Sequence, residues 1–330
     1  TYKSLMARLS RAGFTQHFVA TAILPDWWDA SCAADPQLLP EVELRVARFL
    51  GAPLEIVADP SVALTVAAPD SARLRRIHAV DRDRLQPAIH AATRVAGAVV
   101  RCLRHPETED APIPPDGADW RDGIGRDGSA VTLEHILGDL WKRGVAVVPV
   151  EVSPKPSFQG MACIVDGRRV IVLPQAWDEP GRVAFLLAHE AGHHAAGDCS
   201  PDAPVVDEVA SGDGSAIEAR ADAFATRVIA GRHGIPHLAG GPPRALAQQA
   251  RTLERERGVE ATAMLCQWAR QTGDYRAAQS AAKALGRASG ARQTLRAFFD
   301  RHVDVDEASD SDRALLRCVF GDADRHEAAG

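Results

Sequence analysis

The five-residue pattern His189-Glu190-Ala-Gly-His193 constrains this chain more than any other stretch of its sequence. It lies within residues 183–196, a run without proline and with an apolar lead-in, which predicts a helix. Residues four apart share a helix face, so His189 and His193 can place two imidazoles on one metal ion. Glu190 lies one residue further round, beside the open coordination position, where a carboxylate can take a proton from water. This spacing is that of zinc peptidases.

A polar helix end with unrelated histidines is the plain alternative. In a chain with 12 histidines, the pattern arises by chance on the order of a few times per hundred such chains. The apolar lead-in reduces the weight of that alternative, and so does a suitable third ligand downstream.

The third ligand is expected on a following helix, residues 215–229. A catalytic zinc site usually takes three protein ligands and a water. A metzincin would place a third histidine at position 199, which is Cys199 here, so an acidic ligand is the other common solution. Glu218 can complete the metal site, and Asp222 can accept a hydrogen bond from the far nitrogen of a ligand histidine. A solvated helix face is the competing interpretation of this pair, and the upstream motif favours ligands by roughly four to one.

These segments resemble the ImmA/IrrE family of metallopeptidases. The resemblance rests on residues 185–193 and on Glu218, Asp222, Phe224 and Ala225. Residues 133–150 look like the family's first helix and strand, and residues 160–173 look like its central hairpin. The resemblance covers about residues 130–285. An insertion-like stretch at 198–214 and the residues from 228 to 232, where the family usually has Leu-Leu-x-Pro, depart from the pattern without touching a ligand.

The resemblance implies an α+β fold in which a zincin-like domain, a small sheet plus the motif helix, is flanked by helical regions. It implies a zinc-dependent peptidase that often cleaves a repressor or antitoxin, in stress, phage or toxin–antitoxin regulation. In that mechanism Zn²⁺ is held by His189, His193 and Glu218, and Glu190 is the general base. Oxyanion support is sought from a cationic or phenolic side chain. The candidates, each also open to a structural interpretation, are Tyr275, His233 and His237.

Four regions are predicted along the chain: a helical region 1–105, a Pro-, Gly- and Asp-rich linker 106–130, the metallopeptidase domain 131–240 and a helical region 241–330. Residues 72–104 are expected to form one long helix with a bend at Pro87, whose arginines form a solvated face, with contacts to phosphates as the alternative. Residues 198–214 are expected to be a surface loop, with a lid over the cleft as the alternative. The acidic tail after Val303 is expected to fray.

The N-terminal region has a weak resemblance of its own. Residues 47–57 look like the last helix of XRE-type helix-turn-helix repressors, yet no clear recognition helix is present. Asp26, Asp29 and Asp35 lie where a DNA reader would need cations. Recruitment of a protein partner or self-association is therefore favoured over DNA binding. The alternative function is a transcription regulator whose peptidase-like domain senses or binds without cleaving, and the intact Glu190 argues against it.

Composition limits the remaining possibilities. A length of 330 residues allows two or three domains, and a net charge of −6 argues against bulk nucleic-acid binding. The six scattered cysteines form no Cys-x-x-Cys pair, which fits reduced thiols in a cytoplasmic protein. Because no apolar run approaches the ~20 residues of a membrane span and no signal peptide opens the sequence, no membrane partner is expected.

Overall fold

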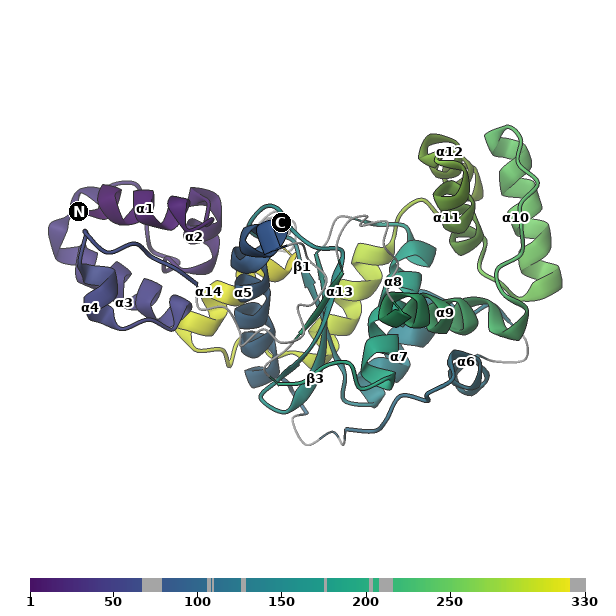
Figure 1. Cartoon of the computed structure of the whole chain (residues 1–330), viewed down its shortest axis with the longest axis horizontal. Helices are drawn as coiled ribbons and strands as arrows, with labels where there is room; N and C mark the ends of the chain where they lie inside the picture. The colour runs from purple at the N-terminus through teal and green to yellow at the C-terminus, as the bar shows by residue number, and fades with distance from the viewer. Residues whose placement is uncertain are drawn as a thin grey trace.

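The computed structural model describes residues 1–66, 79–105, 108, 110–125, 129–174, 177–201, 204–207 and 216–320. Within these ranges the fold is α+β, as predicted: many helices surround one small four-stranded sheet. Figure 1 shows an elongated molecule with the sheet near its middle and the N-terminal helices at one end. None of the helices in the described ranges combines the length and the apolar run that a membrane crossing needs.

The sheet has the strand order β1-β3-β2-β4. Its strands are β1 (Ala146–Val150), β2 (Gly160–Val165), β3 (Arg168–Pro174) and β4 (Val205–Asp207). β1 runs parallel to β3, whereas β2 is antiparallel to both β3 and β4. The β2–β3 hairpin turns at Asp166 and Gly167, both with positive φ (49° and 75°), as a two-residue hairpin turn requires. This hairpin is the one predicted over residues 160–173.

Helices cover both faces of the sheet. α5 (Ala79–Arg101) and α14 (Asp310–Phe320) lie on one side, and α7 (Leu133–Lys142), α8 (Pro180–Ala195) and α13 (Ala291–His302) lie on the other (Figure 1). All residues of β1 are buried, as expected for a strand covered on both faces. The sheet is therefore packed by helices from the predicted 1–105 region and from the predicted 241–330 region.

The N-terminal end of the molecule is a small helical unit. It contains α1 (Tyr2–Arg11), α2 (Gln16–Ala22), α3 (Leu39–Leu50) and α4 (Leu54–Ala58), with short 3-10 turns at Cys32–Ala34 and Pro36–Leu38. Its core is a cluster of Phe14, Phe18 and Phe49 with ring centroids 5.3–5.6 Å apart. Thr15 caps α2, and Gly51 ends α3 in the left-handed conformation, both as the sequence predicts.

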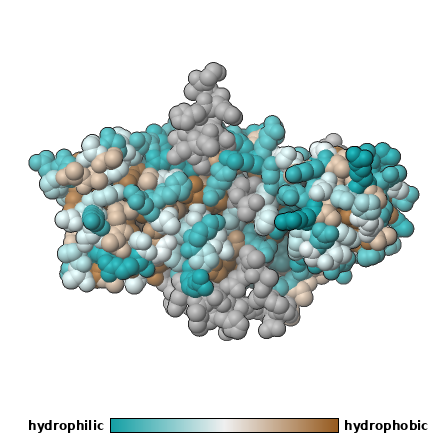
Figure 2. Space-filling view, turned by 90° about the horizontal axis from the view of Figure 1, so that it is seen from above, coloured by the Kyte–Doolittle hydropathy of each residue, from teal (hydrophilic) through white to brown (hydrophobic). Residues whose placement is uncertain are grey.

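A three-helix arm forms the other end. It consists of α10 (Pro243–Arg257), α11 (Ala261–Thr272) and α12 (Tyr275–Leu285), which pack on one another, and α11 also packs on α8. The arm projects at the upper right of Figure 1, and strongly hydrophilic residues gather at that end in Figure 2. α9 (Ala216–Ala230) and the 3-10 turn Gly231–His233 precede it.

The predicted linker at 106–130 is wrong in part, because it contains α6 (Gly117–Ile124). The Asp116 side chain accepts from the Ala118 amide at its start, and Trp120 is fully buried. The Trp120 indole also donates to Asp139 on α7. A short helix held by one large buried side chain leaves little trace in a composition dominated by Pro, Gly and Asp.

Two further expectations need correction. The tail after Val303 does not simply fray: residues 310–320 form α14, whose Leu315, Leu316 and Val319 are buried. The long helix ends at Arg101 rather than 104, because Leu103 forms a β-bridge with Val303. It is also mainly a core helix, buried along its apolar face, and its predicted start at residue 72 lies outside the described residues.

α14 joins the N-terminal helices to the sheet. The Arg317 guanidinium donates to the carbonyl oxygens of Thr21 (2.8 Å) and Leu24 (2.5 Å) at the end of α2, and it forms an ion pair with Asp26. The carbonyl of Cys318 accepts from the amides of Glu151 and Val152, directly after β1. One short helix therefore holds two parts of the chain together.

We expect Arg317→Met to lower the free energy of unfolding by about 2–4 kcal/mol, since it leaves buried carbonyls without their donor. Arg317 is only 8% exposed, so solvent cannot replace the lost contacts. Urea unfolding followed by circular dichroism measures the change. Arg276→Met on the exposed face of α12 is the matched control. Equal stabilities for the two variants would contradict this role of Arg317.

Candidate metal centre

The motif helix α8 lies in close contact with α9, the helix that carries the predicted third ligand. Gly192 of α8 faces Phe224 of α9, and a methyl group at Gly192 would lie 3.1 Å from Phe224 Cδ1. That distance is tighter than ordinary packing allows, so the absence of a side chain lets the two helices approach. The predicted helices at 183–196 and 215–229 are both present, although Ser215 lies outside the described residues.

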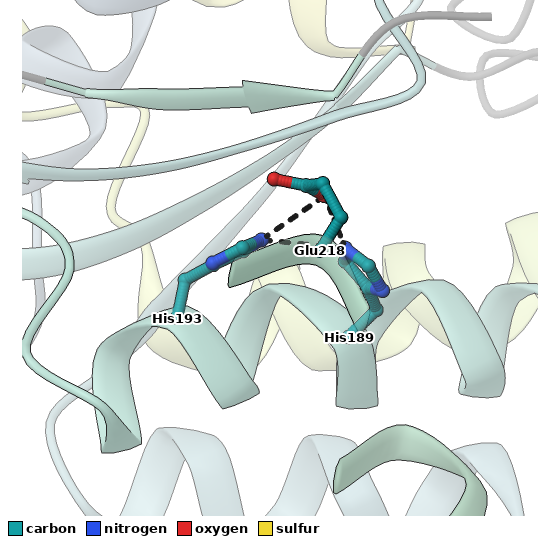
Figure 3. A group of neighbouring side chains, drawn as sticks. All are labelled: His189, His193 and Glu218. Atoms are coloured by element: carbon teal, nitrogen blue, oxygen red, sulfur yellow. Dashed lines mark hydrogen bonds and ion pairs between the residues drawn. The ribbon is translucent and has the colours of Figure 1, made fainter. Parts of the chain in front are cut away.

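The close approach brings three potential ligands together. His189 Nε2 lies 3.3 Å from His193 Nε2 and 3.3 Å from Glu218 Oε2, and His193 Nε2 lies 3.7 Å from the same oxygen. Figure 3 shows the two imidazoles rising from one helix toward the carboxylate of Glu218. One ligand atom from each of the three residues lies within 4.8 Å of the others, so this group could hold a metal ion.

A carboxylate lies against the far nitrogen of each ring. His189 Nδ1 is 3.0 Å from Asp222 Oδ1, and His193 Nδ1 is 3.1 Å from Asp198 Oδ2. Carboxylates only accept, so a ring proton on Nδ1 would be bound by each of these acids and would leave both Nε2 atoms as acceptors. The two rings are thereby fixed in the orientation that directs Nε2 to the centre.

The donor set fits a divalent cation such as zinc. With both ring protons on Nδ1, two nitrogen lone pairs and one carboxylate oxygen face one another at 3.3–3.7 Å. Three acceptors at this distance repel unless a cation lies between them. Ligand atoms that sit ~2.0–2.1 Å from one tetrahedral zinc are themselves about 3.3 Å apart. The observed separations match that spacing.

Asp198 is a site residue that the sequence interpretation missed, because it was assigned to the loop after the helix. α8 ends at Ala195, and Gly197 then adopts a positive φ of 69°. The amides of Gly197 and Asp198 donate back to the carbonyls of His194 and His193, which reverses the chain. The reversal returns Asp198 to the ring of His193. A helix end followed by a glycine and then an aspartate is the sequence signal that could have predicted the position of Asp198.

The two carboxylates that contact the histidine rings, those of Asp198 and Asp222, each also contact an arginine. Asp198 is 11% exposed, and its Oδ1 accepts from Arg220 Nη2 of α9 at 2.5 Å. Asp222 lies 3.8 Å from Arg270 Nη2 of α11. These contacts with arginines fix the positions of the two carboxylates. Contacts from α9 and from the helical arm therefore support the ligand rings.

Glu190 lies beside the cluster but is not one of its three members. It is fully buried, and its carboxylate lies against Gly160, the first residue of β2. Its charge has an electrostatic effect on the neighbouring strand: burial, with a smaller contribution from Glu190, raises the pKa of the Cys163 thiol to about 12. Glu190 is thus enclosed between α8 and the sheet.

The histidine next to the ligands has a different contact. His194 Nε2 lies 3.1 Å from the carbonyl oxygen of Val170 on β3, so its ring donates to the sheet and not to the cluster. Burial lowers its pKa to about 4, which keeps the ring neutral above that pH. His194 therefore ties α8 to the sheet, in line with the expectation that it is not a ligand.

The three candidates for oxyanion support lie outside the cluster. Tyr275 begins α12 and is 54% exposed. His233 and His237 are exposed residues in and after the 3-10 turn that follows α9. The structure does not bring them together with His189, His193 and Glu218, and their role in catalysis stays a prediction.

Comparison with known proteins gives no family for this chain. No family model matches it, and no curated protein matches it.

We expect native protein to contain one zinc ion per chain and His189→Ala to lose it. Asp198→Asn should keep the metal but bind it ~10–100-fold more weakly, because the ring of His193 loses its anionic partner. Inductively coupled plasma mass spectrometry and a competitive chelator titration measure the two effects. Asp300→Asn, whose carboxylate is 59% exposed on α13, is the control. Native protein without metal, or equal affinities for the two Asn variants, would refute these assignments.

His194 makes stability depend on pH. Its pKa is lowered in the folded protein from an ordinary 6.5 to about 4, so the unfolded chain binds the proton more readily between these values. The neutral ring of His194 makes its whole contribution to the free energy of unfolding above pH 6.5. That contribution falls by about 3 kcal/mol as the pH is lowered to 4. We expect His194→Gln, which keeps a donor for Val170, to show a shallower loss of stability over pH 6.5–4. Parallel curves for the two proteins would contradict this.

Proposed function

We propose that this protein is a zinc-dependent endopeptidase of the ImmA/IrrE type, with a zincin-like catalytic domain, that cleaves a partner protein such as a repressor or an antitoxin. The observation that carries the proposal is the burial of Glu190. It is a completely buried carboxylate directly after the ligand His189 on the same helix, yet it is not one of the three converging ligand residues. A site that only stored a metal would gain nothing from burying an additional charge, which is costly.

The residues around the cluster suit peptide hydrolysis. A zinc ion, when bound, would polarise the carbonyl of a peptide and lower the pKa of a water molecule. Glu190 would take the proton of the attacking water on a carboxylate oxygen and return it to the leaving amine. Asp222 and Asp198 would hold the rings of His189 and His193 with their protons on Nδ1, so that Nε2 remains free to bind.

Exposure indicates the side from which a peptide would approach. The side chain of His193 and the residue Glu190 are fully buried, whereas the side chains of Glu218 and Asp222 are 32% and 44% exposed. The cluster is therefore open to solvent on the α9 side. A substrate carbonyl reaching it from there would meet Glu218 before the general base.

The N-terminal helices suit recruitment of a protein better than DNA reading. Three of the four large hydrophobic side chains exposed in the described residues, Trp27, Leu54 and Ile56, lie in this unit, and the fourth is Tyr275 on α12. The side chain of Asp29 accepts from the amide of Ser31, and that of Asp35 from the amide of Gln37, so these carboxylates stabilise local turns. We infer that this unit holds the substrate protein, with DNA binding not favoured.

We expect Glu190→Gln to retain one zinc per chain and to lose cleavage, since the amide keeps the shape of the carboxylate but cannot accept the proton. A proteome-derived peptide mixture, incubated with each protein and analysed for new amino termini by mass spectrometry, measures cleavage. The variant should lower it by at least ~100-fold. Glu218→Ala should instead lose zinc. Equal zinc loss in both variants would show that the roles are misassigned.

The same variant can identify the partner. Glu190→Gln should bind the substrate protein without cleaving it. If the N-terminal unit recruits the substrate, adding Trp27→Ser to this variant should reduce the amount of substrate bound. A partner that is retained by the wild-type protein without any new amino terminus would favour the regulator function over the peptidase.

A further inference from the structure

The first residue of β2 lies against the proposed general base. A methyl group at Gly160 would lie 1.9 Å from Glu190 Oε1, 2.7 Å from its Cδ and 3.1 Å from its Cγ. All three of its nearest heavy atoms belong to this one side chain. The volume that any other residue would fill at position 160 is therefore occupied by the carboxylate of Glu190.

The backbone of Gly160 does not itself require glycine. Its φ is not positive, and it pairs with Asp207 of β4 in ordinary antiparallel register. Glycine weakens a strand in such a position, because it adds conformational freedom to the unfolded chain and contributes no packing. Close approach of another group is the remaining reason for a glycine here, and that group is Glu190.

Contacts with the sheet hold α8 in place, and the Glu190 side chain is buried. The contact from His194 to the Val170 carbonyl, 3.1 Å long, fixes α8 against β3. Glu190 is fully buried, so its carboxylate cannot swing into solvent. A side chain at position 160 would therefore displace the Glu190 carboxylate from the position it occupies beside β2.

We propose that Gly160 is a positioning residue for Glu190. The gap left by its missing side chain, here called the Gly160 notch, holds the carboxylate in one place beside the ligand cluster. The notch follows from the packing alone, and its consequence for catalysis rests on the proposed peptidase function. A misplacement of about 1 Å in a catalytic group can cost ~100-fold in rate, so a fixed position has a measurable effect.

The first test uses stability and needs no substrate. The four proteins are wild type, Gly160→Ala, Glu190→Ala and the double variant. Gly160→Ala should lower the thermal unfolding midpoint by roughly 3–8 °C. The same change in the Glu190→Ala background should lower it by less than ~1 °C, because the clashing atoms are gone. Gly123→Ala, where a methyl group would have nothing within 4 Å, is the control and should not lower it.

An equal fall in both backgrounds would overturn the notch. If Gly160→Ala alone does not fold, a folded double variant supports the proposal and an unfolded one refutes it. Both results hold whether or not the protein cleaves peptides.

The second test addresses catalysis, with a peptide identified as a substrate of the wild-type protein. Gly160→Ala should keep one zinc per chain and lose ~100-fold in kcat with little change in KM. The side chain of aspartate is one methylene shorter than that of glutamate. In the Glu190→Asp protein, Gly160→Ala should therefore lower kcat by less than ~3-fold. A purely structural role would slow both backgrounds equally, and that outcome would overturn the positioning role. No cleavage by the wild-type protein would refute the proposed function, while the stability test still decides the notch.

Discussion

The site depends on the close packing of α8 against α9. Gly192 allows the ring of Phe224 to lie against the motif helix, and Gly117 of α6 lies against the Phe224 carbonyl on the other side, where a methyl group would be 2.4 Å away. This packing sets the distance between the two histidines on one helix and Glu218 on the other. A bulkier residue at either glycine would push α9, and with it Glu218, away from its present position, and a metal site tolerates only about ±0.2 Å in its ligand distances.

The centre combines groups that oppose folding in isolation. Two buried imidazoles, a partly exposed carboxylate and the buried Glu190 lie between packed helices, and burial of such groups costs free energy unless each has a partner. The rings obtain partners from Asp198 and Asp222, and the arginines behind these acids extend the network to α9 and α11. Groups held this rigidly do not need to reorganise during a reaction, which is the usual advantage of a buried polar site.

Sequence reasoning finds what local periodicity encodes. The i, i+4 spacing of the histidines, and the same spacing of Glu218 and Asp222, places each pair on one helix face without knowledge of the fold. Local periodicity does not predict the role of Asp198, because its position depends on a glycine that reverses the chain. It does not predict the role of Gly160 either, because Glu190, whose carboxylate occupies the space beside it, is 30 residues away in sequence. α6 and α14 were missed for a related reason: their stability comes from a few buried side chains, while Pro, Gly and Asp dominate the composition around them.

The position of α14 has a consequence for the order in which the protein can assemble. Arg317 contacts the carbonyl of Thr21, 296 residues earlier, and the chain emerges from the ribosome at about 5–20 residues per second, so roughly 15–60 s separate these two residues. From the time β1 and β3 have been made until α14 docks, the amides of Glu151 and Val152 after the edge strand β1 lack the Cys318 carbonyl that accepts from them in the folded protein. An open edge of this kind can pair with other chains. We therefore expect the segment after β1 to be most open to pairing with other chains before α14 docks.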